Sequence, residues 1–168
     1  MGRKESRMRR ILPALLSVVM LAAAASAASG ISRADFDRVV DFSLTLKDLA
    51  AAADGKESLE TAKIVVISGT VSDVNVVNKD EQTFRARVEL ITGEWVGTED
   101  VRSYSCYVDF SGPEFFKVFP ARPPRVLPAG VIAINSRVIV VGRPVTVTKT
   151  PLGEKRVLVE GMFVRAVE

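Results

Sequence analysis

An apolar run of β-branched residues at Ile64–Ile67 is followed by Gly69 and then by further valines at short intervals. A continuous β-branched run is typical of a strand that is buried on both faces. A glycine inside a strand indicates a bulge or a sharp bend. The pattern therefore predicts one long strand over Lys63–Val77, bent at Gly69, which pairs with different neighbours before and after the bend. Small closed barrels are built from such strands.

Two later stretches, Thr83–Thr92 and Ser103–Phe110, alternate between apolar and other residues. A period of two predicts strands that are buried on one face only. The predicted inward residues are Phe84, Ala86, Val88, Leu90, Tyr104, Cys106, Val108 and Phe110. The predicted outward residues include Arg85, Arg87, Glu89, Tyr107 and Asp109. The polar stretch between the two strands, residues 93–102, is expected to be a loop or a ragged hairpin end.

Two more strands are predicted near the end of the chain, over Arg137–Val147 and Arg156–Val167. Each contains an internal glycine that is expected to bend it, as Gly69 bends the first strand. Before them, several prolines exclude a regular element over most of residues 111–135, although a short helix is predicted at 114–119. The pattern therefore predicts a mainly β domain of five strands with an irregular insertion between the third and the fourth.

Residues 28–62 are predicted to be helical, with an approximate apolar stripe of helical period. Ser32 is the predicted N-cap and Asp35 stands in the capping-box position. Gly55 is a plausible stop, because glycine tolerates the left-handed conformation at a helix end. Two interpretations of this amphipathic segment remain open: a helix packed against the barrel, or a helix over 32–53 that binds a partner.

The first 27 residues have the layout of a secretory signal peptide. Arg9 and Arg10 end a basic region, an apolar region follows, and Ala25-Ser26-Ala27 forms a cleavage pattern. The alternative is an uncleaved anchor in the inner membrane, but the apolar stretch is short, rich in alanine and contains Pro13. The expected organisation is a signal at 1–27, a helical segment at 28–62 and a barrel at 63–168, in a periplasmic or secreted protein.

The charge of the chain is unevenly distributed. The formal net charge is +3, but residues 28–168 hold 18 basic and 19 acidic residues, so the expected mature chain carries −1. Residues 117–168 alone carry +6 and residues 63–116 carry −4. The basic C-terminal part can attract polyanions, or the acidic part of the same molecule can neutralise it. A net charge of −1 argues against strong non-specific binding to nucleic acid.

Several kinds of chemistry are excluded or disfavoured by composition. The chain has no histidine and one cysteine, which removes imidazole bases, intramolecular disulfides and thiolate clusters. Cys106 falls on the predicted core face and is expected to be an inert thiol. No glycine-rich phosphate loop is present, and the acids near Glu94 do not have the spacing of a calcium loop. We therefore expect no enzyme activity, no cofactor and no metal.

The strand order and three short motifs resemble a known family. VISGTV at 66–71, YSCYVDF at 104–110 and VIVVG at 138–142 are similar to the exported oligonucleotide/oligosaccharide-binding (OB) proteins grouped as tRNA-anti-like. The resemblance covers roughly residues 60–168 and implies a five-stranded OB-fold Greek-key barrel preceded by an amphipathic helix. The proline-rich connection around Pro128-Ala129-Gly130 replaces the family's usual Leu-x-x-Gly-Asp turn. The resemblance implies a binding module and supplies no catalytic residues.

Candidate ligand-binding residues lie on the outward faces of the second and third predicted strands, the faces that such barrels use for ligands. They are Arg85, Arg87 and Tyr107, together with Arg122 and Arg125 in the connection. Cations and an aromatic ring suit an anionic oligomer, either an oligonucleotide or an acidic oligosaccharide. Ion pairs with Glu89 and Asp109 would explain the arginines equally well. The alternative function is a protein-interaction module of the cell envelope that uses the N-terminal helix or a barrel edge.

Overall fold

The computed structural model describes residues 32–122 and 126–167, so the predicted signal at 1–27 lies outside the described residues. The chain divides into two compact units after Phe36, and the second unit holds α3 and every strand. The elements are α2 (Arg33–Val39), β1 (Val40–Asp41), α3 (Leu46–Ala53), β2 (Ile64–Asn78), β3 (Arg85–Val96), β4 (Asp100–Ser111), the 3-10 turn η1 (Pro113–Phe115), β5 (Arg137–Lys149) and β6 (Lys155–Ala166). No helix in these described ranges is long and apolar enough to span a membrane.

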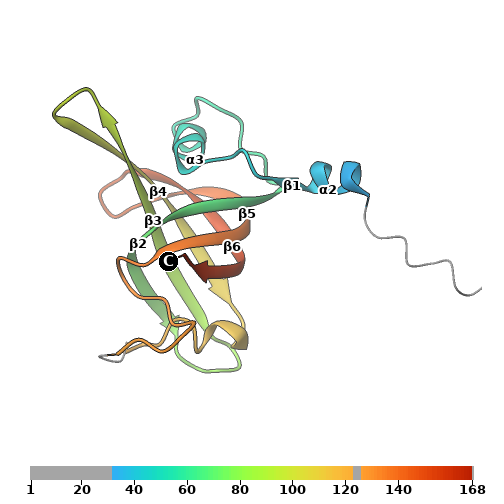
Figure 1. Cartoon of the computed structure of the whole chain (residues 1–168), viewed down its shortest axis with the longest axis vertical. Helices are drawn as coiled ribbons and strands as arrows, with labels where there is room; N and C mark the ends of the chain where they lie inside the picture. Colours follow the sequence, from blue (N-terminus) through green and yellow to red (C-terminus); the bar gives the residue numbers. More distant parts are fainter. Residues whose placement is uncertain (1–31, 123–125, 168) are drawn as a thin grey trace, which may run out of the picture. The chain divides into compact units, whose positions relative to one another are not determined.

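Five strands close into a barrel, as predicted (Figure 1). The order is β2-β3-β4-β6-β5, and an antiparallel pairing between β2 and β5 completes the ring. β4 and β6 run parallel, with Tyr107 opposite Leu158, while the other barrel pairs are antiparallel. The two-residue strand β1 adds a sixth member by pairing Val40 with Ile64 of β2.

The predicted bend of β2 is where this strand changes partners. β2 pairs with β5 over Val65–Thr70 and with β3 over Thr70–Asn78, and a bulge follows between Val71 and Asp73. A Cβ atom at Gly69 would lie 2.9 Å from Leu46 Cδ1 and 3.1 Å from the carbonyl oxygen of Ile91. Glycine is needed here because α3 and β3 approach the backbone of β2 closely.

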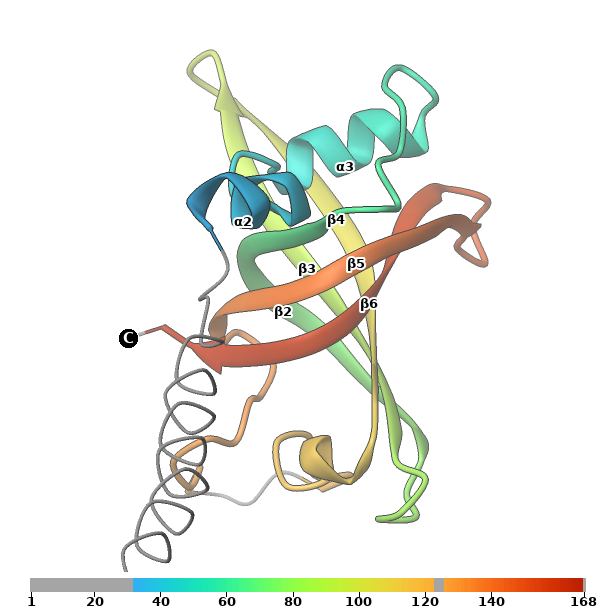
Figure 2. The same ribbon diagram turned by 90° about the vertical axis from the view of Figure 1, so that its right-hand side faces the viewer.

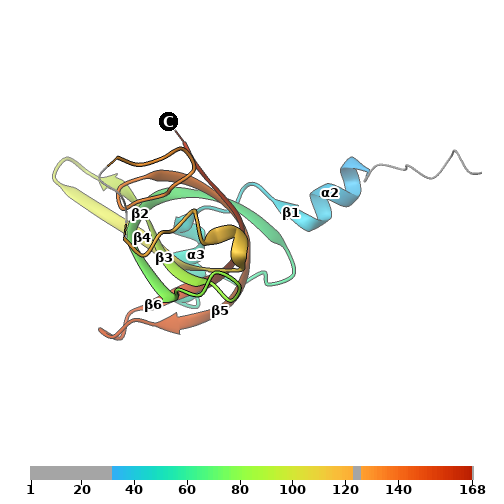
Figure 3. The same cartoon turned by 90° about the horizontal axis from the view of Figure 1, so that it is seen from below.

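The core fills the barrel and extends into a cover at each end. Figure 2 shows α3 across one end of the barrel and η1 at the other. In the view from below, η1 lies within the ring of strands (Figure 3). The insertion buries Phe115 and Phe119, whose rings lie 4.9 and 5.0 Å from that of Phe110 between centroids. The buried residues of α3 are Leu46, Leu49, Ala52 and Ala53.

The thiol of Cys106 is fully buried on the inner face of β4, where the alternation places it. Burial in this apolar interior raises its pKa to about 12. The predicted position of Cys106 in the core is therefore confirmed, and burial disfavours the thiolate, which is the reactive form of cysteine.

The predicted helical segment contains two helices rather than one continuous helix over 32–53. Ser32 caps α2, since its Oγ accepts a hydrogen bond from the Asp35 amide at 3.1 Å. The chain then pairs with β2 as β1, and Asp41 accepts a hydrogen bond from the Ser43 amide at 2.8 Å, which turns the backbone. Thr45 begins α3 through a capping box that the prediction missed. α3 ends at Ala53, next to the predicted stop at Gly55 with φ 78°.

Residues 93–102 were expected to be a loop or a ragged hairpin end, and the structure shows the end of a hairpin that is regular rather than ragged. β3 and β4 continue as a regular hairpin in which Glu94 is opposite Arg102 and Trp95 is opposite Val101. Gly97 makes the turn with φ 74°. The polar composition misled the prediction because this hairpin projects past the barrel and has no buried face to produce alternation.

Candidate ligand-binding face on strands β3 and β4

The outer face of β2, β3 and β4 carries the side chains that alternate with the core residues. One cross-strand row contains Asn75, Arg87 and Asp109. The next row contains Glu89 and Tyr107. Residues in one row are direct neighbours on one side of the sheet, so their side chains can bond to one another or to a shared ligand.

Arg87 and Asp109 form a two-pronged ion pair across β3 and β4. Arg87 Nε lies 2.7 Å from Asp109 Oδ1, and Arg87 Nη2 lies 2.8 Å from Oδ2. The bond to Asp109 raises the pKa of Arg87, although burial acts in the opposite direction. The guanidinium carbon also lies 5.6 Å from the centre of the Tyr107 ring. Arg87 is therefore held in a fixed orientation, and Asp109 compensates its charge.

A second polar network lies next to this pair and includes Arg156, which was not among the candidate residues. Glu89 accepts a hydrogen bond from Ser72 Oγ at 2.9 Å and faces Arg156 Nε at 3.3 Å. Arg156 in turn donates from Nη2 to Glu154 at 2.8 Å. Its Nε is buried without a hydrogen-bond partner among the described residues, so it pairs with Glu89 by charge alone. Arg156 was missed as a candidate. Its place in the sequence, one residue before the buried Val157 of β6, predicts an outward side chain and could have identified it.

A shallow hollow of about 210 Å³ opens on this face. Its lining residues are Asn75, Val77, Arg85, Ala86, Arg87, Asp109 and Phe110. Arg85 is exposed, and no ion pair of this residue is formed within the described part of the chain. The structure therefore brings together Arg85 and Arg87 in one hollow, with Tyr107 beside it through its contact with Arg87.

Of the two candidates in the connection, Arg122 does not line this hollow. Arg122 is exposed, and its neighbour Ala121 lines a different hollow, beside the second half of β2. Arg125 lies outside the described residues. Among the other C-terminal basic residues, Lys149 and Lys155 form a cross-strand pair near the β5–β6 turn.

Glu94 bonds to side chains of α3 and β4. Lys47 Nζ of α3 lies 2.8 Å from Glu94 Oε2, and the Tyr104 hydroxyl donates to the same oxygen at 2.9 Å. The bond from Lys47 is the main cause of the lowered pKa of Glu94. The cluster ties α3 to the base of the β3–β4 hairpin. The described residues contain no group of acids and cysteines arranged to hold a metal ion.

The strand order defines the class: this chain is an OB-fold protein, with a closed five-stranded Greek-key barrel and the insertion between its third and fourth strands. Neither family models nor curated proteins match the sequence. The chain is similar to the small single-stranded DNA-binding protein from Streptomyces coelicolor, at 11% identity and TM-score 0.38 over 62% of this chain and 91% of that one. It is also similar to the N-terminal domain of PriB from Thermoanaerobacter tencongensis, at 12% identity and TM-score 0.36 over 62% and 96%. For Plasmodium falciparum SSB in complex with ssDNA, the identity is 12% and the TM-score 0.39 over 62% and 94%.

Proposed function

We propose that this protein is a non-enzymatic OB-fold module that binds a short stretch of an anionic oligomer on the outer face of β3 and β4. The favoured ligand is a single-stranded oligonucleotide, and an acidic oligosaccharide is the alternative. The observation that supports it is the hollow that combines the free Arg85 with the oriented Arg87, next to the ring of Tyr107.

Each of the three residues has a chemical role in the proposed site. Arg85 offers an uncompensated cation at the edge of the hollow and suits a phosphate or carboxylate. Asp109 uses the Nε and Nη2 donors of Arg87, so other donors of the same guanidinium remain for the ligand. Tyr107 and the guanidinium plane suit stacking of an unpaired base.

The charge of the face limits the expected affinity. The arginines at 87 and 156 are paired with Asp109 and with Glu89, so few cations remain to neutralise phosphates. Binding to single-stranded nucleic acid loses affinity with salt at a slope of about −0.7 per phosphate contacted. With one or two contacts, we expect weak binding and a slope between about −0.7 and −1.4.

Fluorescence anisotropy of a labelled oligothymidylate across a salt titration tests the proposal. Arg85→Ala and Tyr107→Ala should each weaken binding about tenfold, and Arg85→Ala should also reduce the salt slope. Arg165→Ala is the matched control, because this exposed arginine lies in β6 opposite Ile139 of β5 and removes the same charge. An acidic oligosaccharide as competitor identifies the ligand class. Equal losses for Arg165→Ala and Arg85→Ala, or no binding at low salt, would contradict the proposal.

A further inference from the structure

The second half of β2 has one side that no strand of the described ranges covers. β5 pairs with β2 only as far as Thr70, and the last backbone bonds on that side are made by Val71. Its amide donates to the Ser136 carbonyl at 2.9 Å, and its carbonyl accepts from the Asn135 amide at 2.8 Å. The chain before β5 then turns away, since the Ser136 amide bonds to the Ala133 carbonyl and Asn135 has φ 70°.

The geometry of β3 shows which way the backbone of β2 points beyond this turn. The carbonyl of Phe84 accepts a hydrogen bond from Gly112, which follows β4, so Phe84 presents its backbone to β4. Alternate residues of a strand point the same way, so Ala86 and Val88 also face β4. They are opposite Val76 and Val74 of β2. The N–H and C=O groups of Val74 and Val76 therefore point away from β3, to the uncovered side.

A groove runs along this uncovered side. It has a volume of about 300 Å³. Its lining residues are Val74, Val76, Lys79, Pro120, Ala121, Ile132, Ala133 and Ile134. The opposite wall belongs to the insertion, where Ile132 bonds to the Val118 carbonyl rather than to β2. Within the described residues, the backbone of Val74 and Val76 therefore faces a mostly apolar groove without a hydrogen-bond partner.

We propose that this edge of β2 is a docking site for an extended segment of a partner protein. Open strand edges pair with added strands through main-chain hydrogen bonds, and pockets for alternate side chains give specificity. Val74 and Val76 provide the two backbone positions, and the apolar lining accepts apolar side chains at every second position of the segment. The free edge is short, so three to five residues of the partner suffice to fill it.

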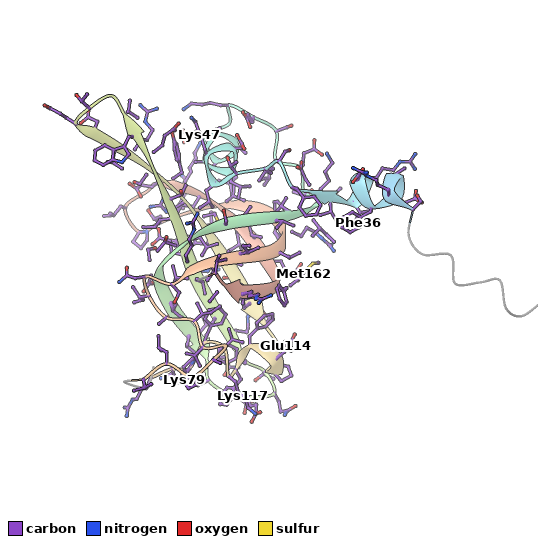
Figure 4. The ribbon with its side chains drawn as sticks, viewed as in Figure 1. Phe36, Lys47, Lys79, Glu114, Lys117 and Met162 are labelled. Carbon is purple, nitrogen blue, oxygen red and sulfur yellow. The ribbon has the colours of Figure 1, made fainter. Side chains whose placement is uncertain are left out.

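Charge at the end of the groove adds a requirement for acidic residues in the partner. Lys79 lines the groove, and Arg122 follows the lining residue Ala121 and is exposed. Lys79 and Lys117 both lie at this lower end of the barrel (Figure 4). The nearby Asp80 is also charged, but it is bonded within its own turn to the amides of residues 82 and 83, and the lining of the groove contains Lys79 and no acid. The matching segment has alternate apolar residues followed by acids.

Amide hydrogen exchange on the purified protein, read by NMR, tests this docking site. The Val74 and Val76 amides should exchange rapidly in the free protein and at least tenfold more slowly with a saturating peptide. The probe is a seven-residue peptide in which two valines alternate with threonines and two glutamates follow. The same peptide with N-methyl groups on the amides that would face β2 should give no protection.

Two protein variants separate the backbone contribution from the charge contribution. Val76→Pro removes a donor that β3 does not use, so the barrel should fold while peptide binding falls at least tenfold. Lys79→Glu should weaken binding of the acidic peptide and strengthen binding of one with lysines in place of the glutamates. Lys56→Glu is the control, because this exposed lysine follows α3 and should affect neither peptide. Slow exchange of both amides in the free protein would overturn the proposal, and so would protection that rises with protein concentration, because a second copy would then be the occupant. An equal effect of the N-methylated peptide, or no protection at millimolar peptide, would also overturn it.

Discussion

The outer face of β3 and β4 and the free edge of β2 lie on the same barrel but present opposite kinds of polar group. On the face, the polar groups are side chains that bond to each other, as Arg87 does to Asp109. At the edge, they are the backbone groups of Val74 and Val76, which have no partner among the described residues. A ligand that contacts Arg87 must share this guanidinium with Asp109, whereas a ligand at the edge meets backbone groups that bond to none of the described residues.

This difference gives the two regions different expected responses to salt. Binding on the face depends on charge and should weaken as salt rises, because ions screen exposed charges and compete for phosphate. Binding at the edge depends on backbone hydrogen bonds and apolar contacts, so only its acidic end should respond. The salt dependence therefore separates the two sites on one molecule.

The largest expected effect on stability comes from removing the aromatic anchor of the insertion, which forms one wall of the groove. Phe119 is fully buried and its ring packs against that of Phe110, so Phe119→Ala should lower the free energy of unfolding by about 3–5 kcal/mol. Chemical denaturation measures this, with the exposed Leu152→Ala as a control expected within about 0.5 kcal/mol of wild type. At temperatures where the variant stays folded, the edge should lose peptide affinity and the face should keep its oligonucleotide affinity. Equal losses at both sites would show that the two regions are not independent.

A smaller effect is expected from removing the acid of the ion pair on the outer face of β3 and β4. Asp109→Asn removes the charge that compensates Arg87, so oligonucleotide affinity at low salt should rise several-fold and the salt slope should steepen by up to about 0.7. The free energy of unfolding should fall by about 1 kcal/mol, because the pair is partly exposed. Glu160→Gln is the control, since this acid is the β6 neighbour of Asp109 and removes the same charge. Unchanged affinity for Asp109→Asn would mean that Arg87 does not contact the ligand.

The smallest expected effect on stability is at the start of α3. There the backbone amide of Thr45 has a side-chain partner, whereas the backbone of Val74 and Val76 at the β2 edge has none among the described residues. In the α3 capping box, the Asp48 carboxylate accepts bonds from the Thr45 hydroxyl at 2.6 Å and from the Thr45 amide at 2.8 Å. These bonds lower the pKa of Asp48 below the usual 3.8. Asp48→Ala should cost roughly 0.5–1 kcal/mol of unfolding free energy at neutral pH.

The pH dependence of that cost follows from the direction of the shift. A lowered carboxyl pKa stabilises the folded state above the unfolded value and loses this contribution as pH falls through the folded value. The difference between wild type and Asp48→Ala should therefore be constant from neutral pH to about 5 and shrink below about 4. Urea denaturation across this range measures it. A difference that grows on acidification would contradict the capping role.

Much of the fold and part of the candidate face follow from the alternation in the sequence. Val88 and Cys106 are buried where the period of two places them, and Arg87 and Asp109 share an outward row. The sequence also suggested that Arg87 forms a cross-strand ion pair, because Arg87 and Asp109 share an outward row. The structure confirms the pair with Asp109. The family resemblance and the roles of Arg85 and Tyr107 in binding remain predictions.

The sequence by itself determined which side of each strand faces the core, because burial is recorded locally as alternation. The tertiary structure alone decided which strand edges are covered. Lys47 and Glu94 are far apart in sequence and meet only because α3 lies beside the β3–β4 hairpin. Val74 and Val76 read as ordinary strand residues, and their backbone is left open only because β5 pairs with β2 no further than Thr70. Uncovered edges and long-range side-chain pairs depend on where each partner strand stops and on how distant segments pack, and no local pattern of apolar residues records either.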